Sequence, residues 1–392
     1  MPSTVVLSTC PLNGVDSGGK RRIDALMNAL GRRTILVQPG LHHPKYTTVP
    51  YSPDLGRRKF GINWGIFNFH LPQNRRFARN LIRNQSPACV VLTSIWGEPV
   101  VRGLNEVPVV LDAHDVNATA IAERFGRIHP FTKLVHAQEA RTVKCVDHLF
   151  ACSDQDREQF LESYGIPASK VTVVPNGVDT NSPPPDSSVL SEDAFWQSNV
   201  KQQTPLFFMG KLDYQPNVRA LAFLNDTLLP ELEQRSPGKY RIIVCGGPVP
   251  AATFRPGIAF AGAVDDRRLQ AYLHGSSVCL APVFTGSGTR LKVLEYLSAA
   301  RPVVATAKAA EGIPCESGKH LVIADPESFA DEIEKLARDP ARSDSMAQAG
   351  RNLVRERFDW TAAVQPKWRS VLDQWCDFSP TSPWPKEISE QG

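Results

Sequence analysis

The stretch that most constrains the fold runs from Ser277 to Thr306 and reads SVCLAPVFTGSGTRLKVLEYLSAARPVVAT. Two short apolar runs without a helical period, Val278 to Pro282 and Val303 to Thr306, are typical of buried strands. Between them a glycine loop, Gly286 to Gly288, leads directly into a helix that we expect from Arg290 to Ala300. Strand, glycine loop, helix and strand in this order predict a parallel α/β unit.

The residues of this loop and helix favour an anionic ligand. The first N–H groups of a helix lack intrahelical partners and lie at the positive end of its dipole, and glycines let a phosphate approach the backbone. Arg290 and Lys292 are expected in the first turn, where the dipole disfavours cations unless an anion binds between them. Glu295, one turn after Lys292, can accept hydrogen bonds from ligand hydroxyls. A glycine turn in a plain βαβ unit is the alternative, but the three charged residues favour a nucleotide-sugar site.

The length and punctuation of the chain indicate two α/β domains. A chain of 392 residues is long for one domain. The segment TNSPPPDSS at 180–188 contains three consecutive prolines, which continue neither helix nor sheet, so we place a linker there. Strands and helices alternate on both sides of it. We therefore predict an amino-terminal domain at 1–185, a second domain at 186–360, and a final helix and tail at 361–392.

The composition predicts a protein of the reducing cytoplasm. No apolar run approaches the roughly 20 residues that span a bilayer, and the first residues, MPSTVVLSTCPLNG, lack a basic n-region. The 8 cysteines are scattered without CxxC spacing. Two of them, Cys245 and Cys279, fall inside strand-like runs, which indicates buried thiols rather than disulfides or zinc ligands.

Positive charge gathers near the amino terminus. The first hundred residues carry 13 Lys and Arg against 4 Asp and Glu, whereas the whole chain has a net charge of only +4. We expect an amphipathic basic helix from Gln73 to Asn84, with Arg75, Arg76, Arg79 and Arg83 around its apolar face. The basic domain suggests an anionic partner, namely a membrane surface, a phosphorylated lipid or nucleic acid. A solvated basic face packed on the sheet is the alternative.

Further candidates follow strand ends in the amino-terminal domain. Gly18 and Gly19 lie in a loop before a helix expected from about Arg21, where glycines permit close approach of a ligand or another domain. His114 follows a buried strand, at the sheet edge where open α/β sheets bind ligands, and can contact a substrate hydroxyl or a developing charge. It can equally be a hydrogen-bonded structural histidine.

Two polar patterns are better explained by helix capping than by chemistry. Asp154 and Asp156 form a D-x-D, which in some glycosyltransferases binds a metal, but Ser153 before them favours an N-cap with acidic residues in the first turn. In the second domain, we expect Asn217 to cap a helix that begins at Val218. Residues 40–70 show no clear period and predict irregular structure.

The order of several motifs resembles a known family. The second half, and with it most of the chain at about 5–375, is similar to GT-B glycosyltransferases of the large family-four group of retaining enzymes. The resemblance implies two Rossmann-like, doubly wound domains that face a central cleft. The segments at 208–217 and 288–295 are particularly similar to bacterial sugar transferases of exopolysaccharide synthesis. The motifs are SGGKRR, the strand-end HD at 114–115, VVPNGVD, FMGKLDYQPN, GAVDD, GSGTRLKVLEYLSAARPVVAT and AAEGI at 309–313.

The resemblance also implies residue roles. Glu295 would hold the ribose of the nucleotide, the backbone around Val264 would meet the base, and His114 would approach the donor sugar or the acceptor. The helix from Trp360 to Cys376 would brace the amino-terminal domain. The other donor-binding residues that we expect are Gly18 and Gly19 facing the cleft, Lys211, the diphosphate loop Gly286, Ser287, Gly288 and Thr289, and Glu311, Gly312 and Ile313 near the donor sugar.

Ser287 departs from the family pattern, because the first glutamate of the family's pair should stand at this position. The family usually carries an arginine and a lysine after the first strand of the second domain, and this chain has only Lys211 there. Arg290 and Lys292 would supply the missing positive charge. The expected reaction moves a sugar from a nucleoside diphosphate sugar to a glycan or other anionic acceptor, with retention and without a bound metal or other cofactor. Three alternatives remain. The first is a nucleotide-sugar epimerase or hydrolase, and the second is a catalytically weak binding subunit. The third is a sugar transferase whose acceptor is DNA instead of a glycan. The donor, the acceptor and the oligomeric state are open.

Overall fold

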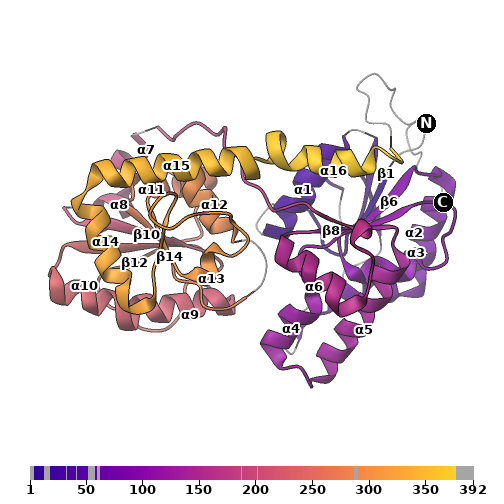
Figure 1. The fold of residues 1–392 in the computed structure, drawn as a ribbon, viewed down its shortest axis with the longest axis horizontal. Coiled ribbons are helices and arrows are strands. Elements are labelled where there is room, and N and C mark those ends of the chain that lie inside the picture. The colour runs from indigo at the N-terminus through magenta and orange to yellow at the C-terminus, as the bar shows by residue number, and fades with distance from the viewer. Residues whose placement is uncertain are drawn as a thin grey trace. The chain divides into compact units, whose positions relative to one another are not determined.

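The computed structural model describes residues 4–12, 18–31, 33–40, 42–51, 58–59, 62–186, 188–200, 202–286 and 290–376. The chain forms two compact units (Figure 1). Unit 1 comprises Met1–Asn176 and Val364–Gly392, and unit 2 comprises Gly177–Ala363. The proline-rich segment at 180–188 belongs to unit 2. Each unit is a parallel sheet with helices on both faces, which confirms the expected α/β class.

Unit 1 is built on a seven-stranded parallel sheet of order β3-β2-β1-β6-β7-β8-β9. From β1 the chain winds outward to β3 and then returns to β6 on the other side of β1. The topological switch point of this sheet therefore lies between β1 and β6. The strands are β1 (Thr4–Leu7), β2 (Thr34–Pro39), β3 (Thr47–Tyr51), β6 (Cys89–Leu92), β7 (Val109–Asp112), β8 (His148–Ala151) and β9 (Val171–Val173), and a separate pair is formed by β4 (Arg58–Lys59) and β5 (Ile62–Asn63).

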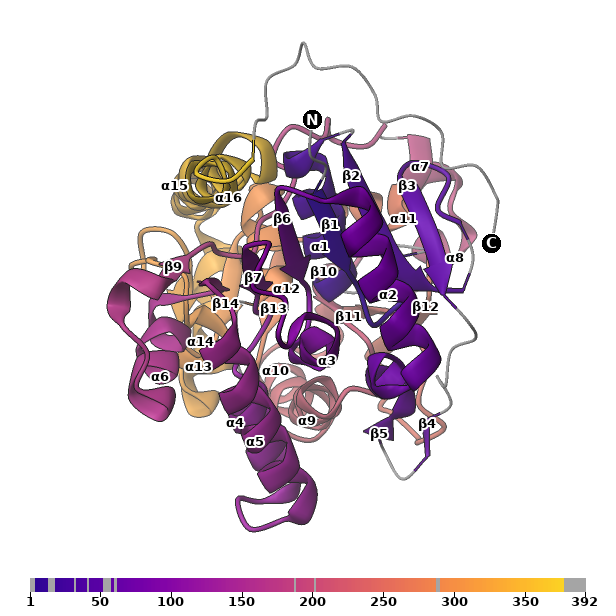
Figure 2. The same ribbon diagram turned by 90° about the vertical axis from the view of Figure 1, so that its right-hand side faces the viewer.

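Alternate residues of each strand serve the two faces of this sheet. Val5 and Leu7 of β1 join a core cluster with α2, α3, α5 and α6, and α1 and α16 pack together. The α4/α5 hairpin projects below the sheet (Figure 2). The helices are α1 (Gly18–Leu30), η1 (Trp64–His70), α2 (Pro72–Gln85), η2 (Ile95–Gly97), α3 (Glu98–Val101), α4 (Asn117–Phe125), α5 (Pro130–Cys145), α6 (Asp154–Tyr164), η3 (Ala168–Lys170) and α16 (Gln365–Leu372).

Unit 2 contains a six-stranded parallel sheet of order β12-β11-β10-β13-β14-β15. The chain again starts in the middle, at β10, winds out to β12 and returns to β13 beside β10. The switch point, where open α/β sheets bind ligands at their carboxyl edge, lies between β10 and β13. The strands are β10 (Thr204–Met209), β11 (Tyr240–Cys245), β12 (Ile258–Gly262), β13 (Val278–Ala281), β14 (Val303–Ala305) and β15 (Val322–Ile323).

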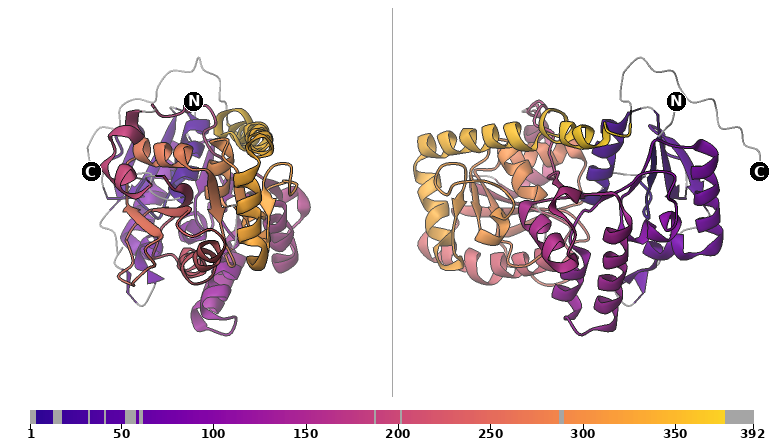
Figure 3. Two further views of the ribbon diagram at one scale, coloured as in Figure 1. Left: turned by 90° about the vertical axis from the view of Figure 1, so that its left-hand side faces the viewer. Right: turned by 45° about the vertical axis from the view of Figure 1, so that its right-hand side comes forward.

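Two hydrophobic clusters cover the faces of this second sheet. Phe207 and Met209 face α11, α12 and α15, whereas Leu206 and Phe208 face α9, α10 and α14. Figure 3 shows these helices around the strands. Cys245 and Cys279 are buried in β11 and β13, as predicted. The helices are α7 (Ser188–Glu192), α8 (Ala194–Asn199), α9 (Gln215–Phe223), the π-helical turn η4 (Leu224–Leu228), α10 (Leu229–Arg235), α11 (Asp266–Gly275), α12 (Leu291–Ser298), α13 (Ala307–Ala310), η5 (Pro326–Ser328), α14 (Phe329–Arg338), α15 (Pro340–Phe358) and the π-helical turn η6 (Trp360–Val364).

Local expectations had mixed outcomes. The basic helix at 73–84 is α2, and Ser153 accepts a hydrogen bond from the Asp156 N–H, so both predictions are confirmed. The prediction of irregular structure at 40–70 is wrong, because β3 and η1 lie there. Periodicity fails for such short elements, whose stability comes from tertiary packing. The carboxyl-terminal segment packs on α1, where Gln365 and Arg369 donate to the carbonyl oxygens of Ala25 and Ala29 at 3.4 Å and 2.9 Å.

Candidate functional site

The candidate site of unit 2 lies where the loops after β10 and β13 meet. Gly286 belongs to the loop after β13, and a Cβ atom built on it would lie 3.5 Å from Cγ of Pro216, at the start of α9 after β10. The two loops thus touch at the switch point of the sheet. Three of the predicted loop residues, Ser287, Gly288 and Thr289, lie outside the described residues.

Lys292 is the central cation of this edge. Its ammonium donates to Oδ1 of Asn217 at 2.7 Å and lies 4.2 Å from the centre of the Phe208 ring. Removal from water lowers the pKa of Lys292 to about 7, the charge of Arg290 adds to this effect, and that of Glu295 opposes it. The partners that hold this ammonium are therefore a neutral amide and a ring face, and a bound anion would stabilise its charged form.

Arg290 precedes α12 instead of lying in its first turn. The helix begins at Leu291, one residue later than expected, and Arg290 is its N-cap in an extended conformation. Its Nη2 donates to the carbonyl oxygen of Gly286 at 2.5 Å, and Gly286 has a φ of +109°. The guanidinium thus folds back over the loop. This backbone conformation favours glycine, which explains the residue type at Gly286.

Asn217 does not cap α9, contrary to the sequence prediction. The helix begins three residues earlier, at Gln215, with Tyr214 as its N-cap, and Asn217 is its third residue. Its side chain is 6% exposed and turns back toward the end of β10, where Nδ2 donates to the carbonyl oxygen of Lys211 at 2.8 Å. Pro216 explains the earlier start, because proline suits the first turn of a helix.

Glycines at the ends of β10 and β11 close the backbone around this amide. Gly210 has a φ of +158°, and a Cβ there would lie 2.6 Å from Nδ2 of Asn217. A Cβ on Gly246, whose φ is +131°, would lie 1.8 Å from the carbonyl oxygen of Gly210. A side chain at Gly246 would collide with the backbone of Gly210, and one at Gly210 with the side chain of Asn217, so the edge of the sheet is closely packed here.

The other predicted donor-binding residues lie along the same edge or beyond it. Glu295 is one turn after Lys292 on α12, and Lys211 is exposed, 3.9 Å from Asp213. Glu311 follows α13 and pairs with Lys308 at 2.7 Å, Gly312 has a φ of +76°, and Ile313 is buried. Val264 follows β12, the edge strand, and packs against the core. Of the predicted residues that the structure describes, Arg290, Lys292 and Gly286 lie where the two loops meet, and the donor-binding roles stay predictions.

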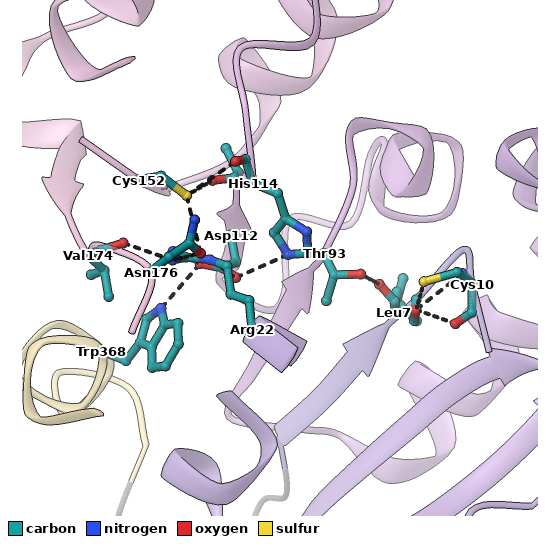
Figure 4. Close-up of polar contacts among 12 residues, drawn as sticks. Leu7, Cys10, Arg22, Thr93, Asp112, His114, Cys152, Val174, Asn176 and Trp368 are labelled. Atoms are coloured by element: carbon teal, nitrogen blue, oxygen red, sulfur yellow. Dashed lines mark hydrogen bonds and ion pairs between the residues drawn. The ribbon is translucent and has the colours of Figure 1, made fainter. Parts of the chain in front are cut away.

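Unit 1 has its own buried polar cluster at the carboxyl end of β7 (Figure 4). Arg22 and Asp112, both fully buried, form a bidentate ion pair with distances of 2.9 Å and 2.6 Å. Arg22 also donates to Val174 O and to Oδ1 of Asn176, and its guanidinium lies 5.1 Å from the Trp368 ring centre. Trp368 Nε1 donates to Asp112 at 3.2 Å. The cluster ties α1, β7 and α16 together.

The ion pair outweighs the cost of burial for both partners. Burial alone would raise the pKa of Asp112, but Arg22 and His114 hold it well below its ordinary range. For Arg22, burial lowers the pKa, but the charge of Asp112, its hydrogen bond and the nearby Cys152 and Asp115 together raise it more, so the net shift is upward. Nearby, burial raises the pKa of the Cys152 thiol far above its usual value, and this thiol donates to the carbonyl oxygens of Ala113 and His114. Cys152 is therefore a structural thiol.

His114 lies between this cluster and the start of α1. Its Nε2 is 3.5 Å from Oδ2 of Asp112, and its side chain is 23% exposed. A Cβ built on Gly19 would lie 3.2 Å from Nδ1, so the ring packs on the glycine. Because a carboxylate only accepts, this geometry favours the proton on Nε2. Gly18 and Gly19 are the first residues of α1, not a loop before it, which corrects the expected start near Arg21.

Two family models match this chain in succession. Residues 17–182 match the model described as Glycosyltransferase Family 4, and residues 203–339 match Glycosyl transferases group 1. Together the two models span both units in the order that the sequence motifs predicted. The chain belongs to the family 4, group 1 glycosyltransferases.

Curated relatives of this family match the chain over part of their length. It is 26% identical over 298 residues to a D-inositol 3-phosphate glycosyltransferase of Kineococcus radiotolerans, covering 69% of this chain and 65% of the relative. It is also 26% identical over 278 residues to a glycogen synthase of Mycobacterium tuberculosis, covering 65% of this chain and 60% of the relative. The chain thus spans less than two thirds of the length of both relatives.

Solved structures confirm the GT-B fold. Sucrose-phosphate synthase from Thermosynechococcus elongatus superposes with a TM-score of 0.74 at 15% identity, covering 95% of this chain and 99% of that one. HepE of Anabaena, in complex with UDP and glucose, gives a TM-score of 0.71 at 14% identity, covering 95% and 100%. At these identities the likeness establishes the fold alone, and the chemistry of the site rests on the residues of this chain.

Sequence reasoning missed the residues that hold the charged groups in place. Arg22 lies in the SGGKRR motif, which predicts no role for it. Asp112 lies two residues before His114 at the end of a strand, and its position alone predicts no ion pair. The Asp112-Ala113-His114 spacing is a usable signal, because alternate residues at a strand end point the same way. Asn217 gave no such signal, since its partners Lys211 and Lys292 are 6 and 75 residues away in sequence.

Proposed function

We propose that this chain transfers a sugar from a nucleoside diphosphate sugar to an acceptor hydroxyl, with retention of the anomeric configuration. The donor's diphosphate would bind at the edge of unit 2 where the loops after β10 and β13 meet. Two of the relatives are a D-inositol 3-phosphate glycosyltransferase and a glycogen synthase, which supports a role in glycan or polysaccharide synthesis. HepE, a structural neighbour, binds UDP and glucose, which supports a uridine nucleotide as the first donor to test.

The observation that carries the proposal is the state of Lys292. Removal from water lowers its pKa to about 7, and its ammonium is held by an amide and an aromatic ring beside a second cation, Arg290. Keeping two cations together in a poorly hydrated place is costly unless an anion joins them. A diphosphate would bring further negative charge to these two cations, and its oxygens accept hydrogen bonds from both kinds of side chain.

The expected mechanism uses stabilisation of the leaving group. As the bond between the anomeric carbon and the phosphate oxygen breaks, negative charge grows on the diphosphate, and Lys292 and Arg290 would stabilise it. Preorganised donors of this kind each contribute a few kcal/mol in a dry site. The leaving phosphate would take the proton of the acceptor hydroxyl. His114, with its Nε2 directed to Asp112, is the residue of unit 1 expected to contact the donor sugar or the acceptor.

Binding of UDP to matched variants tests the diphosphate site. Lys292→Met and Arg290→Ala are expected to weaken UDP binding about 10-fold to 100-fold each, as for the loss of a hydrogen bond to a charged group. Uridine, which lacks phosphates, should bind both variants as it binds the wild type. Arg76→Ala, a change on an exposed surface of unit 1, is the control. Unchanged UDP affinity in both site variants would remove the diphosphate role.

Product analysis separates the reaction from its alternatives. NMR of the product's anomeric carbon decides between retention and inversion, and transfer that persists in excess EDTA would support a metal-independent reaction. Consumption of the nucleotide sugar without an acceptor would instead indicate an epimerase or a hydrolase. Tight UDP binding without turnover on any acceptor would indicate a binding subunit, an outcome that Ser287, where relatives carry a glutamate, would help to explain.

The basic face of α2 is the expected contact with an anionic membrane surface. This helix contains no acidic residue, and Arg76, Phe77 and Arg83 lie on its exposed side, with Phe77 39% exposed. Arg79 has a different task, since it donates to the carbonyl oxygens of Pro99, Val100 and Arg102. An apolar side chain among arginines suits the interface of an anionic bilayer. In the described part of the chain, no helix has the length and apolar character to cross a membrane.

Vesicle sedimentation tests this contact. The protein is expected to sediment with vesicles of phosphatidylcholine and phosphatidylglycerol but not with phosphatidylcholine alone, and Phe77→Asp should abolish the difference. Val249→Asp, at an exposed valine of unit 2, is the matched control. Equal binding to both kinds of vesicle would contradict the proposal. Strongly salt-dependent binding of duplex DNA, lost in Arg76→Glu, would favour the nucleic-acid acceptor instead.

A further inference from the structure

A buried amide joins the two loops of the candidate site. Asn217 lies in the first turn of α9, yet both ends of its amide leave the helix. Nδ2 donates to the carbonyl oxygen of Lys211 in the loop after β10, at 2.8 Å. Oδ1 accepts from the ammonium of Lys292 on α12, at 2.7 Å. One neutral side chain thus connects the loop after β10 to the cation that follows β13.

The two partners fix the orientation of this amide. The carbonyl oxygen of Lys211 can only accept, and the ammonium of Lys292 can only donate. A flipped amide would place its oxygen against the carbonyl and its NH₂ against the ammonium, with both hydrogen bonds lost. The amide oxygen is therefore held toward Lys292, and only a residue with a donor and an acceptor on adjacent atoms satisfies both contacts.

The backbone leaves this amide no freedom to move. A Cβ on Gly210 would lie 2.6 Å from its nitrogen, so the strand end is packed directly on the amide plane. On the other side of Gly210, its carbonyl oxygen lies where a Cβ of Gly246 would be, 1.8 Å away. The ends of β10 and β11 thus both carry a glycine here, Gly210 next to Asn217 and Gly246 next to Gly210. A helix-surface asparagine would not require such packing.

The helix that carries Lys292 is anchored to the same strand. Tyr296, one turn after Lys292 on α12, accepts a hydrogen bond at its hydroxyl from the N–H of Met209, the last residue of β10, at 2.9 Å. Phe208, the residue before it, supplies the ring beneath the ammonium. The hydrogen bond from Met209 to Tyr296 holds α12 against β10, and Asn217 in addition holds the ammonium of Lys292. An ammonium has three N–H groups, and Asn217 takes one of them.

We propose that Asn217 is a positioning residue for the donor's diphosphate, because its neutral amide holds the Lys292 ammonium by a hydrogen bond and so fixes its position without adding a carboxylate beside it. This inference rests on the proposed diphosphate site. A carboxylate in the same place would hold the ammonium equally well but would neutralise it and repel the diphosphate. A small apolar residue would leave the charge but not its direction. The amide is the one side chain of this shape that supplies orientation without charge.

Asn217→Asp and Asn217→Ala separate these two contributions. Asn217→Ala is expected to weaken UDP binding about tenfold, as for one lost hydrogen bond that positions a charged group. Asn217→Asp has the same shape and should weaken UDP binding at least as much, because it pairs with Lys292 internally. It should also raise the pH above which UDP binding declines, since a neighbouring carboxylate favours the protonated lysine. A purely structural role would not move this pH profile.

The coupling to Lys292 gives the decisive measurement. UDP dissociation constants are measured by titration calorimetry for wild type, Asn217→Ala, Lys292→Met and the double variant, from pH 6 to pH 9. The double variant should bind UDP no more weakly than Lys292→Met alone, because Asn217 acts through that ammonium. Asn225→Ala, eight residues further along the same helical segment and bonded to the exposed Asp226, is the matched control. Uridine binding should be equal in all five proteins.

The outcomes distinguish this inference from the proposed function. If Lys292→Met binds UDP as tightly as the wild type, the diphosphate site itself is wrong. If Lys292→Met loses affinity while Asn217→Ala and Asn217→Asp do not, the site stands and the positioning role is overturned. Losses that add fully in the double variant would also overturn it. Circular dichroism melting of each variant identifies any that fail to fold, and Asn217→Asp, the closest in shape, then carries the test.

Discussion

The two units each contain a cation that is removed from water, and the protein treats them in opposite ways. Arg22 of unit 1 is fully buried, forms a bidentate ion pair with Asp112 and spends further donors on Val174 and Asn176. Lys292 of unit 2 has a neutral amide and an aromatic ring as its partners. The first charge is balanced by an ion pair inside the fold, whereas for the second the charge of Glu295 only partly opposes the effects of burial and of Arg290.

The pKa shifts of the two cations have opposite directions for this reason. Burial lowers the pKa of both, but for Arg22 the charge of Asp112, its hydrogen bond and the nearby Cys152 and Asp115 together raise it beyond its ordinary value. For Lys292 the pKa falls to about 7, because desolvation and Arg290 outweigh Glu295. A buried cation with its own carboxylate is thus a structural element, whereas one without is a candidate ligand site. This difference makes the two residues separable by experiment.

The largest expected effect is on stability, at Arg22. Replacing Arg22 with Met leaves the Asp112 carboxylate buried without its partner, which should cost about 3–5 kcal/mol of unfolding free energy. Chemical denaturation measures the loss, with Arg76→Met as an exposed control expected within about 0.5 kcal/mol of wild type. A loss below about 1 kcal/mol would mean that the ion pair does not hold α1 to the sheet.

The matching change in unit 2 should affect binding instead. Lys292→Met removes a cation whose pKa is lowered by burial and by Arg290, so the free energy of unfolding should stay the same or increase at pH 7. UDP affinity should nevertheless fall about 10-fold to 100-fold. Denaturation and calorimetry on the same preparation give both numbers. A destabilisation as large as that of Arg22→Met would show that the contrast between the two cations is wrong.

The pH dependence of UDP binding sharpens the contrast further. Because the pKa of Lys292 is about 7 in the folded protein, UDP binding should weaken as pH rises above 7 and should take up a proton near that pH. Between pH 7 and about 10.5 the unfolded chain binds more protons at this residue, so its contribution to stability rises with pH. Calorimetry in two buffers of different ionisation enthalpy measures the proton uptake. Lys292→Met should show none of it.

Asp112 gives unit 1 a stability that also rises with pH, but in the acid range. Its pKa is held far below that of the unfolded chain, so its contribution to stability is present above about pH 4 and is lost as the pH falls below that value. Acid titration of wild type and Asp112→Asn should therefore converge at low pH. Curves that stay parallel down to pH 2 would contradict the depressed pKa.

The sequence predicted the fold better than it predicted the contacts within the candidate site. Apolar runs alternating with glycine loops were enough for two parallel α/β units, because both patterns are local. The loop at Gly286 and the cations Arg290 and Lys292 followed from spacing on one helix. The roles of Asn217 and Arg22 could not be predicted in this way, because they depend on partners that the order of the strands brings near. The preference of asparagine for helix N-caps wrongly predicted that Asn217 caps α9.

The smallest effect that separates the two regions concerns Trp368. Its Nε1 donates to Asp112 at 3.2 Å, while its ring lies 5.1 Å from the Arg22 guanidinium. Trp368→Phe keeps an aromatic ring beside Arg22 but removes the donor, so unit 1 should lose about 1 kcal/mol and more only if packing suffers. UDP binding in unit 2 should not change. Trp368 lies on α16. A loss of stability close to that of Arg22→Met would therefore mean that the buried ion pair depends on this carboxyl-terminal helix more than on α1 and β7.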